Sequence, residues 1–158
     1  KIEKNCVTRF IGTYDELEKS ILMHFVQYGD TVLEVGANIG TYTVVLADAV
    51  GPTGFVYAFE PFRKIFQIMT ANCALNGLSN VQTYQAGAGN RSQVVKVRAP
   101  DFNEMSNLGT ARIFYQQESH VAMLPYEDGL ERVEVKAMDD VDFERPIDFF
   151  KIEKSMKN

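Results

Sequence analysis

Short apolar runs alternate with segments of helical spacing along the first half of the chain. The runs Thr31–Val35, Phe55–Phe59 and Val81–Ala86 are rich in β-branched and aromatic residues, which is typical of buried parallel strands. Before and between these runs, apolar residues recur every three or four positions, a spacing that predicts helices. The alternation predicts an α/β fold, with a mostly parallel sheet, flanking helices and right-handed crossovers.

Glycines mark the expected ends of the three helices. They lie at Gly29, Gly51 and Gly77, each directly after or close to the last apolar residue of a helical segment. The apolar residues of the first helix, Ile21 and Phe25 among them, are expected to pack on the sheet.

The second half of the chain has a different pattern. We expect a turn at Gly87-Ala88-Gly89-Asn90, a short strand around Val94–Val97, and a long irregular segment over residues 99–131. Alternating residues predict a strand with one exposed face over Arg132–Ala137, and an apolar run predicts a final buried strand over Ile147–Ile152. We therefore expect one domain over residues 1–158, made of a lead-in and helix (1–29), a βαβαβ core (30–90), and an insertion followed by the last core strand (91–158).

Composition excludes several classes of partner. The net charge of −5, without a lysine and arginine stripe, argues against a nucleic-acid surface. No apolar stretch has the length of a membrane span, so no membrane partner is expected. Cys6 and Cys73 do not form a C-x-x-C pair, which fits a reducing, cytoplasmic compartment and an inert buried thiol at Cys73. No metal site is expected, and the oligomeric state stays open.

The segment Gly36-Ala37-Asn38-Ile39-Gly40 predicts a ligand site. It follows a strand and opens a helix, where free backbone N–H groups and the positive end of the helix dipole face a ligand. It lacks the middle glycine of the dinucleotide motif G-x-G-x-x-G, which lets a pyrophosphate lie against the backbone. Glu34 suits a ligand with an ammonium group, and Glu60, at the end of the next strand, suits a ribose. An amine and a ribose together favour S-adenosylmethionine over NAD.

Several motifs resemble the FkbM family of S-adenosylmethionine-dependent methyltransferases over roughly residues 14 to 153. The resemblance rests on Leu33 to Gly40, Phe59-Glu60-Pro61, Asn72 with Leu75-Asn76-Gly77, Met138-Asp139-Asp140, and Ile147 to Ile152. It implies a Rossmann-like class I methyltransferase fold, with S-adenosyl-L-methionine as the cofactor. It also implies methylation of a hydroxyl oxygen on a small molecule, a sugar or a polyketide-like acceptor.

The same resemblance implies which residues hold the cofactor. The methionine part would lie at Glu34 and the glycine turn, the ribose at Glu60, and the adenine between Phe62 and the turn after the third strand. The full set is Glu34, Gly36, Ala37, Asn38, Gly40, Glu60, Pro61, Phe62, Gln85, Ala86 and Gly87.

The sequence departs from the family after its last matching strand. The family continues Lys-Ile-Asp, a variable residue and Glu-Gly, whereas this chain has Lys151-Ile152-Glu153-Lys154-Ser155. The further strands of a complete methyltransferase sheet are also missing, so we expect a domain whose C-terminal strands are absent.

A hydroxyl nucleophile needs a base, and four residues are candidates. They are His120, Asp139, Lys151 and Glu153. Asp139 could equally cap the short turn that follows, and Lys151 could equally belong to a buried ion pair. Aromatic residues in the long segment could line an acceptor pocket or form core packing: Phe102, Phe114, Tyr115 and Tyr126.

Two other classes of function stay open at this point. One is a nucleotide-dependent oxidoreductase, which shares the architecture. The other is a non-catalytic fragment that binds S-adenosylmethionine, which the altered C-terminal segment favours.

Overall fold

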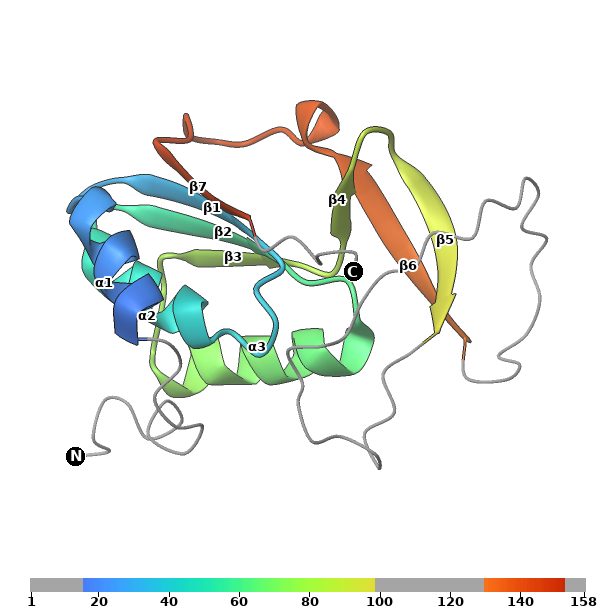
Figure 1. Cartoon of the computed structure of the whole chain (residues 1–158), viewed down its shortest axis with the longest axis horizontal. Helices are drawn as coiled ribbons and strands as arrows, with labels where there is room; N and C mark the ends of the chain where they lie inside the picture. The colour runs from blue at the N-terminus through green and yellow to red at the C-terminus, as the bar shows by residue number, and fades with distance from the viewer. Residues whose placement is uncertain (1–15, 99–129, 153–158) are drawn as a thin grey trace.

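The computed structural model describes residues 16–98 and 130–152, which form two sheets and three helices (Figure 1). The helices are α1 (Glu16–Phe25), α2 (Thr41–Val50) and α3 (Arg63–Leu75), with a short 3₁₀ helix η2 (Met138–Asp140). The strands are β1 (Thr31–Val35), β2 (Phe55–Phe59), β3 (Val81–Tyr84), β4 (Gly87–Gly89), β5 (Gln93–Arg98), β6 (Leu130–Ala137) and β7 (Phe149–Ile152).

The main sheet is parallel and has the strand order β3-β2-β1-β7. Val32 on β1 pairs with Val56 on β2 and with Phe149 on β7, so β1 lies between them. The predicted α/β fold is confirmed, and β1 and β2 have the predicted ends. Parallel strands place their carboxyl ends at one edge of the sheet, where ligands bind in such folds.

All three helices cover one face of the main sheet, below it in Figure 1. Their buried side chains form one cluster with those of the strands: Leu22 from α1 and Val26 just after it, Leu46 and Val50 from α2, Met69 and Cys73 from α3. The prediction for α1 was wrong in detail, because Ile21 and Phe25 are 50% and 60% exposed while Leu22 and Val26 face the sheet.

The opposite face of the main sheet is rich in aromatic rings. Tyr84 stacks on Phe59, with 4.4 Å between ring centroids and 9° between the planes. The segment from Met138 to Ile147 lies over this face and contributes Phe143, whose ring is 4.9 Å from that of Tyr57. The path of that segment between β6 and β7 is visible in Figure 1.

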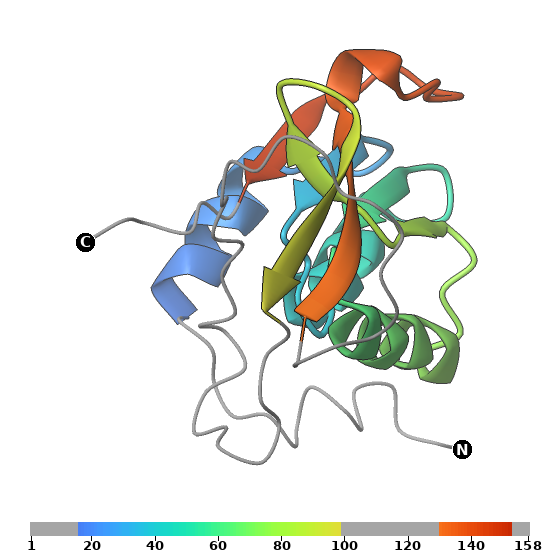
Figure 2. The ribbon, with the colours of Figure 1, turned by 90° about the vertical axis from the view of Figure 1, so that its right-hand side faces the viewer.

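The second sheet has the order β4-β6-β5 and stands beside the carboxyl ends of the main strands (Figures 1 and 2). β5 and β6 are antiparallel, and their valines pack on the start of α3 and on Ile39. The expected turn at Gly87–Asn90 is wrong, since Gly87 to Gly89 form β4 and pair with β6. The two glycines and the alanine of β4 have low β-propensity, so the sequence does not predict a strand there. The strand forms because its backbone pairs with β6.

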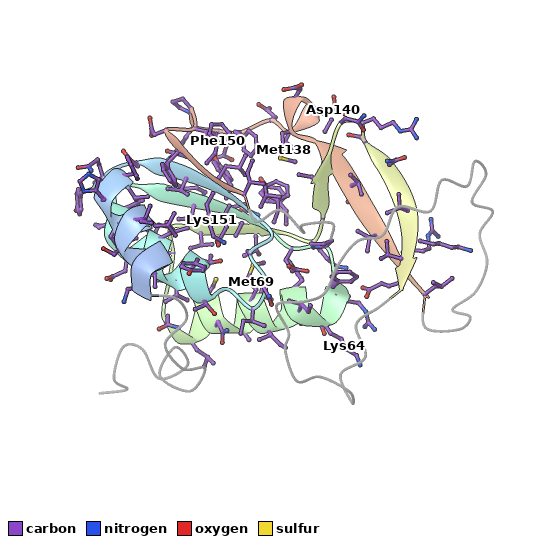
Figure 3. All side chains as sticks on the ribbon, viewed as in Figure 1. Lys64, Met69, Met138, Asp140, Phe150 and Lys151 are labelled. Atoms are coloured by element: carbon purple, nitrogen blue, oxygen red, sulfur yellow. The ribbon has the colours of Figure 1, made fainter. Side chains whose placement is uncertain are left out.

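The last strand differs from its prediction. β7 begins at Phe149 and not at Ile147, and it is an edge strand of the described sheet. Phe150 and Ile152 are 57% and 63% exposed, whereas Lys151 points to the helix side (Figure 3). The prediction of a buried final strand was therefore wrong at Phe150 and Ile152.

Within the described residues, no helix has the length and apolar content needed to cross a membrane. The same residues contain no group of three or more His, Cys, Asp or Glu side chains arranged to hold a metal ion.

The turn into β2 is closed by Gly54, which leaves no space for a side chain. A Cβ there would lie 2.4 Å from Val50 Cβ and 2.6 Å from the Asp30 carbonyl oxygen. We expect Gly54→Ala to lower the free energy of unfolding by about 1–3 kcal/mol through this overpacking. Urea unfolding measures the change. Thr53→Ala, at the exposed neighbouring position, is the control and should change stability by less than about 0.5 kcal/mol; equal effects of the two substitutions would contradict the packing argument.

Candidate functional site

The loop between β1 and α2 crosses the carboxyl end of β2. The backbone N–H groups of Gly36 and Ala37 both donate to the Phe59 carbonyl oxygen, at 3.0 and 2.9 Å. Gly40 N–H donates to the Ala37 carbonyl oxygen at 2.9 Å, which closes the loop before α2 begins. The predicted strand, glycine turn and helix are thus present at the ligand-binding edge of the sheet.

Three residues of this loop have left-handed backbone conformations. Their φ angles are 79° at Gly36, 52° at Asn38 and 86° at Gly40. Asparagine adopts this conformation more readily than most side chains, and here its Oδ1 accepts a hydrogen bond from Ile39 N–H at 2.8 Å. Sterics also favour glycine at position 40, because a Cβ there would lie 3.0 Å from Met69 Cγ on α3 (Figure 3). The loop therefore needs both glycines.

Glu60 joins this loop to the start of α3. Its side chain is 4% exposed. Oε2 accepts a hydrogen bond from Asn38 N–H at 3.0 Å, and Oε1 accepts one from Phe62 N–H at 2.9 Å. The carboxylate therefore links the loop after β1 to the first turn of α3.

Glu34 lies on the helix side of β1 and is fully buried. Thr43 Oγ1 on α2 donates to its Oε2 at 2.6 Å, and Lys151 Nζ on β7 lies 3.3 Å from its Oε1. The same ammonium lies 4.5 Å from the centroid of the Tyr42 ring. This buried charge pair ties β1, β7 and α2 together beneath the glycine loop.

The residues expected beside the adenine lie at the ends of β2 and β3. Pro61 and Phe62 are buried after β2, and Phe62 packs against Ile65 at the start of α3. Gln85 is exposed, while Ala86 is buried against Phe59. Gly87 is the first residue of β4. The backbone bond from Glu60 N–H to the Tyr84 carbonyl oxygen, at 3.0 Å, holds these two strand ends side by side.

The four candidate bases have different outcomes. His120 and Glu153 lie outside the described residues. Asp139 is exposed in η2, and its neighbour Asp140 accepts a hydrogen bond from Ser92 Oγ at 2.5 Å, which fits a turn-holding role for this acidic pair. Lys151 is in the buried ion pair with Glu34, and a protonated lysine has donors but no acceptor. The assignment of a base stays a prediction. The aromatic residues of the long segment also lie outside the described residues.

Asn72, which carries part of the family resemblance but was not among the predicted site residues, contacts the loop directly. Asn72 is 6% exposed on α3, and its side-chain Nδ2 donates to the Ile39 carbonyl oxygen at 2.6 Å. The sequence does contain a hint of this contact: Asn72 follows Met69 by three positions, so a polar amide lies on the helix face that carries the core residues.

The sequence profile described as the methyltransferase FkbM domain matches residues 34–153. The chain belongs to this family. The match runs from Glu34, in the strand before the glycine loop, past the last residue of β7. The expected cofactor of the family, S-adenosyl-L-methionine, is thereby confirmed.

Solved structures of methyltransferases resemble part of the chain. A SAM-dependent methyltransferase from Aquifex aeolicus is 30% identical over 46% of this chain and 39% of its own, with a TM-score of 0.43. A SAM-dependent O-methyltransferase from Thermotoga maritima is 27% identical over 47% of this chain and 29% of its own, also with a TM-score of 0.43. The matched part of the FkbM chain thus corresponds to less than half of either protein. The comparison with curated proteins gave no match.

The residues of the FkbM site fit the chemistry of this cofactor. Glu60 places a carboxylate, which is an acceptor for hydroxyl groups, at the end of β2, and the glycine loop has no side chains at Gly36 and Gly40. Glu34 is fully buried and its charge is met by Lys151, so this pair adds no net charge next to the loop, and the fit to the cofactor rests on the glycine loop and Glu60.

The Glu34–Lys151 pair of the FkbM domain generates a stability prediction. Lys151→Met leaves the fully buried Glu34 carboxylate without its counter-ion, and we expect a loss of about 3–5 kcal/mol in the free energy of unfolding. The double variant Glu34→Gln/Lys151→Met should recover part of that loss, with a coupling energy of about 0.5–3 kcal/mol. A urea-unfolding double-mutant cycle measures both. Additive effects of the two substitutions would contradict the ion pair.

Cys73 lies on α3 and is buried between this helix and the main sheet. Burial, and secondly the Glu34 carboxylate, raise the pKa of its thiol from 9.0 to about 11. The thiol of the unfolded chain ionises at lower pH than that of the folded chain, so the unfolding free energy should fall as pH rises from about 9 towards 11.

In a Cys6→Ser background, we also expect Ellman's reagent at pH 8 to label Cys73 far more slowly in folded than in urea-unfolded protein. Equal labelling rates would contradict a buried thiol.

Proposed function

We propose that this domain binds S-adenosyl-L-methionine at the Gly36–Gly40 loop and transfers its methyl group to a hydroxyl oxygen of an acceptor. The observation that carries the proposal is the bond between Asn38 N–H and Glu60 Oε2. It joins the loop after β1 to an acid at the carboxyl end of β2, which is where a nucleoside ligand needs a ribose acceptor.

Each group of residues would have a separate task. The backbone of Gly36, Ala37, Asn38 and Gly40, with Glu34 on the strand that leads into the loop, would hold the methionine part. Glu60 would accept hydrogen bonds from the ribose hydroxyls. Pro61, Phe62 and the Gln85-Ala86-Gly87 segment would flank the adenine.

Bound S-adenosyl-L-methionine would supply an electrophilic methyl group on a sulfonium sulfur, with the thioether as the leaving group. The protein therefore has to align the acceptor oxygen with the methyl group, exclude water, and accept the hydroxyl proton. His120, Asp139 and Glu153 remain the candidates for that proton, whereas the ammonium of Lys151 is paired with Glu34 and has no acceptor. A sugar, a polyketide-like compound or another small molecule with a hydroxyl group is the acceptor class that we propose.

Two alternatives have their own signatures. A nucleotide-dependent oxidoreductase would bind NAD in calorimetric titration and would not bind S-adenosylhomocysteine. A non-catalytic domain would bind S-adenosylhomocysteine but transfer no radiolabelled methyl group from S-adenosylmethionine to hydroxylated acceptors. Appearance of an O-methyl product, identified by mass spectrometry, supports the proposal.

Glu60 is the residue whose change tests cofactor binding. We expect Glu60→Gln to weaken S-adenosylhomocysteine binding by about 1.5–3 kcal/mol, because a neutral amide replaces charge-assisted acceptors. Isothermal titration calorimetry measures the affinity, with circular dichroism to establish folding. Glu134→Gln, on the exposed face of β6, is the matched control and should leave the affinity unchanged. Unchanged affinity in folded Glu60→Gln protein would remove Glu60 from the site.

A further inference from the structure

The loop that carries the proposed site cannot hold its shape by backbone preference alone. Three of its five residues have positive φ angles, and one of these is not glycine. Such conformations persist where surrounding contacts impose them. The contacts that impose the shape are therefore part of the binding machinery, even where they never touch a ligand.

Helix α3 provides contacts at two points of the loop. Met69 packs so closely on Gly40 that a Cβ on Gly40 would lie 3.0 Å from Met69 Cγ and 3.4 Å from Met69 Cα. One turn further along the same face, Asn72 donates its side-chain N–H to the Ile39 carbonyl oxygen at 2.6 Å. Both partners of this bond are buried, with Ile39 7% and Asn72 6% exposed.

The start of the same helix is fixed to the same loop through Glu60. The carboxylate accepts from Phe62 N–H at the start of α3 and from Asn38 N–H in the loop. A second acid, Glu131 on β6, accepts from Arg63 N–H at 2.7 Å. The bonds to Phe62 N–H and Arg63 N–H fix the start of α3. Asn72 contacts the loop more than two turns later in the helix.

We propose that Asn72 is a positioning residue for cofactor binding, which holds the Ile39 carbonyl so that the Gly36–Gly40 loop is ordered before the ligand arrives. This inference rests on the function proposed above. Without the Asn72 donor, the buried Ile39 carbonyl loses its side-chain partner, and the loop has to be ordered at the expense of binding energy.

The test compares Asn72→Leu, which removes the donor at similar volume, with Asn76→Ala. Asn76 lies one turn later, at the C-cap of α3, and its Nδ2 donates to the Asn72 carbonyl oxygen. We expect Asn72→Leu to raise the Kd of S-adenosylhomocysteine about 5–20-fold. The Kd of 5′-methylthioadenosine, which lacks the amino-acid part, should change less than about twofold, because the loop is assigned to the methionine end. Asn76→Ala should change neither value.

Equal losses for both ligands, or no loss, would overturn the assignment of Asn72, since a general loss of stability affects both ligands alike. A second measurement does not depend on any ligand. Hydrogen exchange of the Asn38 and Gly40 amides should be faster in Asn72→Leu than in wild type and in Asn76→Ala. Unchanged exchange would also overturn the inference. Failure of wild-type protein to bind S-adenosylhomocysteine would instead overturn the proposed function, while the exchange result would still decide whether Asn72 orders the loop.

Discussion

The double acceptor role of Glu60 is the constraint on which the candidate site depends. One carboxylate holds the loop after β1 at Asn38 and the first turn of α3 at Phe62. Asn38 lies in the connection from β1 to α2, and Phe62 lies in the connection from β2 to α3. Because one carboxylate binds both N–H groups, it fixes the position of the loop relative to the start of α3. A buried acid is stable there because its charge is met by oriented N–H groups at the start of a helix.

A second charge arrangement supports the sheet beneath that loop. The pair between Glu34 and Lys151 joins the central strand β1 to the edge strand β7, and Thr43 adds α2 to the same network. Burial of both charges is costly unless they meet each other. The pair therefore favours the register in which β7 lies beside β1, and it places a cation and an anion under the proposed methionine end of the ligand.

Local sequence patterns predicted the parts of the fold that depend on local physics. Strands β1 and β2, the glycine loop and the acids at both strand ends follow from apolar runs, backbone freedom and spacing. Long-range pairing was not predictable in the same way. Gly87–Gly89 becomes a strand only because β6 pairs with it, and the apolar residue Phe150 is 57% exposed on the edge strand β7. The Asn72 contact joins residues 33 positions apart and has only a weak helical-face signal.

The most direct test of the account is a map of the ligand on the backbone. An NMR titration of isotope-labelled protein with S-adenosylhomocysteine follows each assigned amide. The account predicts that the largest shifts occur at Gly36 to Gly40 and at Glu60 to Phe62, with β5 and α1 little changed. Binding that leaves those amides unshifted and moves others would contradict a cofactor site at the glycine loop.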